Sequence, residues 1–304
     1  MQPHHASIDM PSPARSDKLV PMTNQHNKPL TGRVALITGA NTGIGRVTAR
    51  ELAAQGARVF IACRSATRAQ PVIDEIRAAT GQAAVEGLAL DLGDFASIRA
   101  CAKAFLALDL PLHLLINNAG LAGARGLTAS GFEMAFGVNH LGHFLLTQLL
   151  LDRIRRSAPA RIVSVASKAH YRATGIDWNA LRQSTRAITG FPEYATSKLA
   201  NVLYSAELGR RLAGSGVTTY SLHPGVVASD VWRAVPWPLR SLIKLSMIST
   251  EEGAATTLHC ATAAAVATES GLYYDHCRGK EPSQPAQDRA LAADLWKRSE
   301  DWVR

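Results

Sequence analysis

Short apolar runs alternate with stretches of helical spacing from Arg33 to about residue 280. An apolar run bounded by turn residues is typical of a strand buried on both faces, whereas apolar residues that recur every three or four positions indicate an amphipathic helix. The apolar runs predict about seven strands, over 33–38, 58–63, 83–90, 112–117, 161–167, 217–223 and 271–274. The helical patterns lie over 45–55, 68–79 and 94–107, within 131–156, and over 194–213 and 251–266.

This alternation decides the fold class. Strands that alternate with helices form parallel βαβ units, in which helices cover both faces of the sheet. We therefore predict an α/β fold: a single-domain, Rossmann-type, doubly wound parallel sheet over residues 31–280, where no low-complexity linker interrupts the pattern. Residues 281–304 would be a C-terminal extension, and 1–30, which lack an apolar run, a mobile tail. Neither a transmembrane span nor a secretory leader is predicted.

Two stretches interrupt the alternation, and both follow the end of a predicted strand. Residues 170–192 are polar and irregular, while 226–250 are apolar around Pro236-Trp237-Pro238. Ligands of doubly wound sheets bind at the carboxyl ends of the strands, so both stretches are candidate walls of a substrate site, with 226–250 as the substrate-side excursion. Its apolar character favours an apolar substrate. The same side chains would also suit the core, a subunit contact or peripheral contact with a membrane through 236–248.

Composition narrows the function classes. Of 304 residues, 47% are hydrophobic and 19% charged, with a formal net charge of +9. The basic residues are scattered rather than gathered in a stripe, which argues against a nucleic-acid partner. The four cysteines form no CxxC pair and suit a reducing compartment, so we expect a cytoplasmic protein. His140 and His143 lie three residues apart, but no third ligand accompanies them, and no metal site is predicted.

The first predicted strand runs into a glycine-rich turn, TGANTGIG, at 38–45. Between a buried strand and a helix, glycines let backbone N–H groups approach a phosphate, and the positive N-terminal end of the helix attracts it. A glycine turn alone is weak evidence, but this placement favours a dinucleotide. The residues assigned to the cofactor here are Gly39, Asn41, Thr42, Gly43, Ile44 and Gly45.

A base stands where the second strand ends, in Cys63-Arg64-Ser65. Enzymes that use NAD usually have an acid at this position, which binds the ribose hydroxyls and would repel a 2′-phosphate. A guanidinium matches a phosphate with two parallel hydrogen bonds. Arg64, with Arg46 just after the last glycine as a second base, therefore predicts NADP(H) as the cofactor. Arg68 has two interpretations, as a further phosphate ligand or as a solvated residue of the next helix.

Four motifs, in this order, resemble those of the short-chain dehydrogenases/reductases: TGANTGIG at 38–45, NNAG at 117–120, YATSK at 194–198 and HPG at 223–225. The resemblance covers about residues 32–275. Stretches such as GVNHLGHFLLT and SKLANVLYSAEL are similar to the retinol dehydrogenase-like branch. The resemblance implies a Rossmann fold, oxidoreductase activity on an alcohol or carbonyl group, and a homo-oligomer that pairs through the long helices expected near 131–156 and 194–213.

The resemblance assigns catalysis to Asn139, Ser167, Tyr194 and Lys198. Tyr194 would exchange a proton with the substrate oxygen, and Lys198, one helical turn away, would lower the pKa of the phenol through its positive charge. Ser167 would hydrogen-bond the substrate oxygen. Ser164 also lies in the strand, and side-chain alternation alone does not choose the catalytic residue; Ser167 is the one that matches the family motif, with a strand-terminal cap as its alternative role. Asn139 is a poor residue for a helix interior, and in the family it perturbs the helix and helps to hold a water near the lysine.

Further cofactor contacts follow from the same resemblance. Asp91, which ends the third strand, matches the family's adenine-contacting acid, with the N-cap of the next helix as the alternative role. Ser229 is a weaker match to a hydroxyl residue that contacts the nicotinamide carboxamide. The remaining contacts would come from Leu92, Asn117, Ala119, Gly120, Pro224, Gly225 and Val227, together with Tyr194 and Lys198.

Together, these patterns predict an NADP(H)-dependent oxidoreductase that transfers a hydride between the nicotinamide and a small apolar carbonyl or alcohol substrate, such as an aldehyde or ketone. The alternative is a non-catalytic sensor or scaffold that binds a dinucleotide on the same fold. The presence of all four catalytic residue types favours the enzyme.

Overall fold

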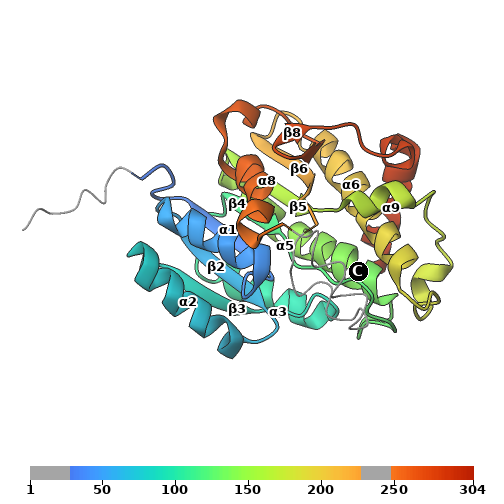
Figure 1. Cartoon of the computed structure of the whole chain (residues 1–304), viewed down its shortest axis with the longest axis horizontal. Coiled ribbons are helices and arrows are strands. Elements are labelled where there is room, and N and C mark those ends of the chain that lie inside the picture. The colour runs from blue at the N-terminus through green and yellow to red at the C-terminus, as the bar shows by residue number, and fades with distance from the viewer. Residues whose placement is uncertain (1–27, 227–247) are drawn as a thin grey trace, which may run out of the picture.

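A mixed sheet of eight strands runs through the described part of the molecule (Figure 1). The computed structural model describes residues 28–226 and 248–304. The strand order is β3-β2-β1-β4-β5-β6-β7-β8, with β1 to β7 parallel and β8 antiparallel to β7. The strands are β1 (Val34–Thr38), β2 (Arg58–Cys63), β3 (Val85–Ala89), β4 (Leu114–Asn117), β5 (Ala160–Val165), β6 (Val217–His223), β7 (Leu272–Asp275) and β8 (Arg278–Gly279).

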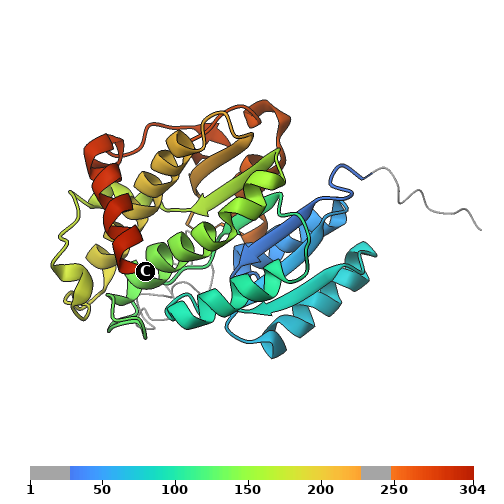
Figure 2. The same cartoon turned by 180° about the vertical axis from the view of Figure 1, so that it is seen from behind.

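Helices cover both faces of this sheet, as Figures 1 and 2 show from opposite sides. One face carries α1 (Gly43–Ala54), α2 (Ala66–Thr80) and α8 (Thr250–Thr262). The other carries α3 (Phe95–Leu106), α5 (Gly142–Arg156), α6 (Phe191–Arg211) and α9 (Arg289–Trp302). Shorter elements are α4 (Met134–Phe136), the π-helical turn η2 (Gly137–Leu141) and the 3-10 turn η3 (Lys168–Arg172).

Each parallel strand supplies both cores, because alternate side chains point to opposite faces of the sheet. Leu36 of β1 packs in one core with Phe105 and Phe144, while the next residue, Ile37, packs in the other core with Leu52. Every residue of β1 is buried. This two-sided burial is why the strands appear in the sequence as continuous apolar runs rather than alternating ones.

The strand order reverses between β1 and β4, which lie side by side although two other strands separate them in sequence. The connections after β1 and after β4 therefore diverge to opposite sides and leave a crevice at the carboxyl ends of the strands. The predicted doubly wound α/β fold is confirmed. Its eighth strand, a short return after residues 276 and 277, was not predicted.

Three element boundaries differ from the sequence-based expectation, and all three affect the site. The helix expected within 131–156 is divided into α4, η2 and α5. The strand expected over 161–167 ends at Val165, so Ser167 lies beyond it. The helix expected from 194 begins at Phe191, which places Tyr194 in its first turn.

The C-terminal segment, for which no structure was predicted, contains α9, which packs against α6 (Figure 2). Trp296 of α9 is buried, stacks on Tyr204 with ring centroids 5.7 Å apart, and meets Phe144 edge-on at 5.2 Å. The guanidinium of Arg211 lies 4.3 Å above the same indole ring. This face of α6 is therefore covered by the chain's own helix α9.

No helix among the described residues is both long enough and apolar enough to cross a membrane. The described residues include only the last residues of the predicted N-terminal tail. Most of the apolar excursion over 226–250 also lies outside them.

Candidate active site

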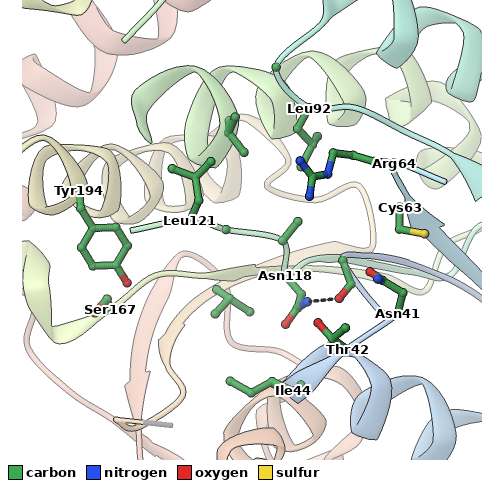
Figure 3. A pocket seen from close by; sticks show the side chains of 18 of the residues that line it. Asn41, Thr42, Ile44, Cys63, Arg64, Leu92, Asn118, Leu121, Ser167 and Tyr194 are labelled. Atoms are coloured by element: carbon green, nitrogen blue, oxygen red, sulfur yellow. Dashed lines mark hydrogen bonds between the residues drawn. The ribbon is translucent and has the colours of Figure 1, made fainter. Parts of the chain in front are cut away.

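A cleft of about 1130 Å³ opens at the carboxyl ends of the strands. Its lining comes from the turn after β1 and from the residues that follow β2, β3, β4, β5 and β6. Figure 3 shows Arg64 and Cys63 at one end, Tyr194 and Ser167 at the other, and Asn118 between them.

The glycine turn forms one wall of the cleft and fits against the loop after β4. Gly39 and Gly43 have φ values of 67° and 55°, in the left-handed region that favours glycine. A Cβ atom on Gly39 would lie 2.9 Å from the Cα of Ala119, and one on Gly45 would lie 2.5 Å from Nδ2 of Asn118. Larger residues would therefore push the two loops apart.

The same turn leads into α1, whose N-terminus is suited to a phosphate. Thr42, the N-cap residue, makes no side-chain hydrogen bond to the first turn of this helix. The first backbone N–H groups of a helix lack partners within it and attract anions. All the predicted residues of the turn line the cleft: Gly39, Asn41, Thr42, Gly43, Ile44 and Gly45.

Positive charge borders the cleft beyond β2. Arg64 and Arg68 both line it and are exposed, and neither forms an ion pair with another described residue. Arg46, by contrast, is not brought to the cleft: its guanidinium pairs with Glu75 of α2, with Nη2 and Oε2 2.6 Å apart. The second base at the cleft is therefore Arg68, and not Arg46 as the sequence predicted.

Asp91 and Leu92 line the cleft beside this basic end, as predicted from the resemblance. The Oδ1 atom of Asp91 accepts a hydrogen bond from the backbone N–H of Gly93 at 2.9 Å. The cap of α3 is instead Asp94, which accepts from the N–H of Ala96 at 2.9 Å. The capping role considered for Asp91 therefore belongs to Asp94.

The loop after β4 brings Ala119 and Gly120 to the cleft, but it does not bring Asn117 there. The side chain of Asn117 is buried and donates to Oγ1 of Thr147 in α5 at 3.1 Å. Its neighbour Asn118 lines the cleft and donates through Nδ2 to the backbone oxygen of Thr38 at 2.8 Å. Sequence reasoning missed Asn118, although the alternation of side chains along a strand could have identified it.

Tyr194, Ser167 and Lys198 meet at the other end of the cleft. The Tyr194 hydroxyl points toward Ser167 in Figure 3, and the two side chains are hydrogen-bonded. Lys198 lies one turn further along α6; its Nζ donates to the backbone oxygen of Val165 at 2.8 Å and lies 5.7 Å from the centre of the Tyr194 ring.

Ser167 also caps η3, because its hydroxyl oxygen accepts from the N–H of Ala169 at 3.1 Å. The functional and the capping interpretations of this residue are therefore compatible. Ser164 is buried within β5 and is not among the residues that line the cleft. Of the two serines, the geometry leaves only Ser167 in reach of a ligand.

Burial sets the proton affinities of the Tyr–Lys pair. It raises the pKa of Tyr194, and the hydrogen bond with Ser167 opposes that rise. Burial also lowers the pKa of Lys198 to about 7. The sequence-based expectation was a Tyr194 pKa lowered by the ammonium; in the structure the desolvation of both groups dominates. Tyr194 is therefore held as a protonated phenol, which is the form that donates a proton.

Asn139 lies in the π-helical turn η2, at the break in the long helix. It does not line the cleft, but its side chain holds a residue that does. Oδ1 accepts from the N–H of Leu121 at 2.9 Å, and Nδ2 donates to the oxygen of Leu121 at 3.0 Å and to Oγ of Ser197 at 2.9 Å. Such π-helical turns occur often at functional sites.

The turn after β6 completes the end of the cleft that holds Tyr194. Pro224, Gly225 and Val226 line the cleft, while Val227 and Ser229 lie outside the described residues. His140 and His143 have separate partners, in α9 and in β1. Within residues 28–226 and 248–304, no three His, Cys, Asp or Glu side chains are grouped as metal ligands would be.

Comparison with known proteins decides the family. The sequence profile described as short chain dehydrogenase matches residues 33–237. The chain belongs to the short-chain dehydrogenase family. It is 48% identical to retinol dehydrogenase 12 of Homo sapiens over 273 residues, which cover 89% of this chain and 86% of that one.

Two solved structures agree with this chain in fold. An uncharacterized protein from Mycobacterium paratuberculosis superimposes with a TM-score of 0.72 at 33% identity, covering 92% of this chain and 96% of the other. The RhlG/NADP active-site complex of Pseudomonas aeruginosa gives a TM-score of 0.62 at 29% identity, covering 83% and 96%. This short-chain dehydrogenase is therefore an oxidoreductase of the class that acts on CH–OH groups, similar to the retinol dehydrogenases.

Proposed function

We propose that this short-chain dehydrogenase uses NADP(H) to interconvert an apolar aldehyde or ketone and its alcohol. The observation that carries the proposal is that one cleft has two exposed arginines at one end and the Tyr194–Ser167–Lys198 group at the other. A dinucleotide that spans this cleft would have its adenosine end near Arg64 and its nicotinamide near Tyr194.

The charges around the cleft support NADP(H) over NAD(H). Residues 63–68 contain no carboxylate, and Asp91 is the only acid among the described residues that line the cleft. A ribose 2′-phosphate would meet Arg64 and Arg68 with no repelling group after β2. One similar structure, that of RhlG, is described as an NADP complex.

The chemistry follows from the protonation states at the other end. NADPH, when bound, supplies the hydride to the carbonyl carbon. Tyr194 donates its phenolic proton to the carbonyl oxygen, and Ser167 hydrogen-bonds the same oxygen as negative charge develops on it. Lys198 lies near the phenol and stabilises its deprotonated form when charged. In alcohol oxidation, the same groups act in reverse.

The walls near Tyr194 support an apolar substrate. Leu127, Phe191 and Val226 line the cleft and remain 39% to 44% exposed, although large apolar side chains are usually covered. An apolar substrate would cover them. Because retinol dehydrogenase 12 is a relative, retinoid-like aldehydes are the first compounds to test. We also propose a reducing compartment such as the cytoplasm, since all four cysteines are free.

The test is the oxidation of NADPH and of NADH by the wild-type protein with a panel of apolar aldehydes and ketones, beside Tyr194→Phe. We expect turnover with NADPH that Tyr194→Phe loses. Binding of NADPH with no turnover on any substrate, equal in both proteins, would instead favour the non-catalytic sensor.

A further inference from the structure

The floor of the cleft, residues 118–121, follows β4, and all four residues line the cleft. Two segments hold this floor at its ends. At one end, the side chain of Asn139 makes both backbone hydrogen bonds to Leu121. At the other end, Oγ1 of Thr38 accepts from the backbone N–H groups of Asn118 at 3.0 Å and of Ala119 at 2.9 Å.

Thr38 accepts these two hydrogen bonds only when its own hydroxyl proton points away from both N–H groups. Its Oγ1 accepts two N–H groups, so its own proton must point to a third partner. Two acceptors lie nearby: the backbone oxygen of Ile116 at 3.5 Å, and Nε2 of His143 at 2.8 Å. The shorter distance assigns the proton to His143. Thr38 is fully buried, so no solvent competes for it.

The partners of His143 fix its tautomer. Nδ1 lies 2.9 Å from the backbone oxygen of Asn139, and a carbonyl oxygen only accepts, so Nδ1 carries the proton. Nε2 of a neutral imidazole is then an acceptor, as the Thr38 hydroxyl requires. Burial lowers the pKa of His143 to about 4, which keeps the ring neutral near neutral pH.

We propose that His143 is a positioning residue for the cofactor: it orients the Thr38 hydroxyl, and Thr38 in turn holds Asn118 and Ala119 in the shape that the dinucleotide requires. His143 and Asn139 lie one helical turn apart and are themselves hydrogen-bonded, so one stretch of helix holds both ends of the cleft floor. The inference rests on the proposed function, because it assigns the purpose of the floor to NADP(H) binding.

Two polar substitutions separate the two hydrogen bonds of His143. In His143→Asn, the short amide replaces Nδ1 and can still donate to Asn139, but it does not reach Thr38. In His143→Gln, the longer amide reaches the place of Nε2 and can accept from Thr38. Fluorescence titration with NADPH should give a dissociation constant raised about tenfold in His143→Asn and within about threefold of wild type in His143→Gln.

A double-mutant cycle tests whether His143 acts through Thr38. Thr38→Val removes the hydroxyl, so adding His143→Asn to it should weaken NADPH binding no further. Full additivity of the two effects would overturn the proposal.

His140 supplies the matched control. It is equally buried and lies on the same stretch of helix, but its Nε2 meets Oγ of Ser299 at 3.1 Å, and it does not line the cleft. His140→Asn should lower the melting temperature and leave NADPH affinity unchanged. Equal losses of affinity in His140→Asn and His143→Asn would show that general destabilisation, and not the Thr38 link, is responsible.

A further readout separates this inference from the proposed function. Should the wild-type protein bind no NADPH, the proposed function fails, while amide hydrogen exchange still examines the floor itself. Exchange at Asn118 and Ala119 should be faster in His143→Asn than in His143→Gln. Identical exchange in the two variants would contradict the positioning role.

Discussion

The two ends of the cleft hold their charged groups in opposite ways. At the end near β2, Arg64 and Arg68 are exposed to solvent and have no ion-pair partner among the described residues. At the other end, Tyr194 and Lys198 are only 5% and 3% exposed. Lys198 makes its hydrogen bond to a backbone oxygen, and burial lowers its pKa to about 7.

This difference shows which properties of a site can be predicted from residue type alone. A guanidinium keeps its charge in any surroundings, so an arginine at the mouth of the cleft attracts a phosphate wherever its side chain reaches. A buried phenol or ammonium has no such fixed state, because desolvation and neighbours set its pKa. The basic end depends on residue type, whereas the end with Tyr194 and Lys198 depends on residue type and on packing.

The largest effect is expected at the buried end. Tyr194→Phe removes the proton donor and keeps the ring, so kcat for aldehyde reduction should fall by about 10²- to 10⁴-fold. The NADPH dissociation constant should change by less than about threefold, since the arginine end is untouched. Stopped-flow and fluorescence titration give the two numbers. A kcat equal to that of wild type would remove Tyr194 from the mechanism.

The exposed end should respond next. Arg64→Asp replaces a phosphate partner by an acid that suits ribose hydroxyls and repels a phosphate. We expect kcat/KM with NADPH to fall about 10- to 100-fold, while kcat/KM with NADH holds or rises. Steady-state kinetics with both cofactors measure this. An unchanged preference for NADPH over NADH would contradict the assignment of Arg64 as the 2′-phosphate ligand.

The pH dependence of stability tests the burial of Lys198. An unfolded lysine has a pKa of about 10.4, and the folded value is lowered to about 7. Between these two pKa values the unfolded chain binds a proton that the folded protein lacks, so Lys198 makes the free energy of unfolding rise with pH. Below about pH 7 both states carry the charge, and the folded protein is destabilised by the full cost of burying it.

Lys198→Met removes this cost, which is on the order of a few kcal/mol. Without cofactor, the variant should melt above wild type at pH 6, and the gap should narrow toward pH 10. Differential scanning fluorimetry at several pH values is sufficient. A gap that widens with pH would show that Lys198 is not desolvated.

The smallest effect is expected at Arg46, and it tests whether Arg46 or Arg68 is the second base beside Arg64. Arg46 is paired with Glu75 on the surface, where an ion pair contributes about 0–1 kcal/mol. Arg46→Gln should therefore shift the NADPH preference by less than about threefold. A loss as large as that of Arg64→Asp would mean that Arg46 turns into the cleft when the cofactor binds.

The sequence predicted features that follow from local patterns. Apolar runs located β1 to β7, and the glycine turn located one wall of the cleft, because backbone geometry there depends on residue type. The misfit of Asn139 with a regular helix corresponds to the π-helical turn η2.

What the sequence could not predict depends on long-range packing. Arg46 and Asn117 bind partners in α2 and α5, and these contacts hold both side chains away from the cleft. No local sequence pattern indicates such contacts. The packing of α9 on α6 and the link between Thr38 and His143 join residues that are far apart in the chain. The pKa of Tyr194 was misjudged for the same reason, since burial is a property of the fold.

The ratio of kcat/KM with NADPH to kcat/KM with NADH, measured for the wild-type protein on one apolar aldehyde, tests the central claim most directly. Two exposed arginines at the cleft and no carboxylate in residues 63–68 predict a ratio of about ten or more. A ratio of one or less would contradict the account.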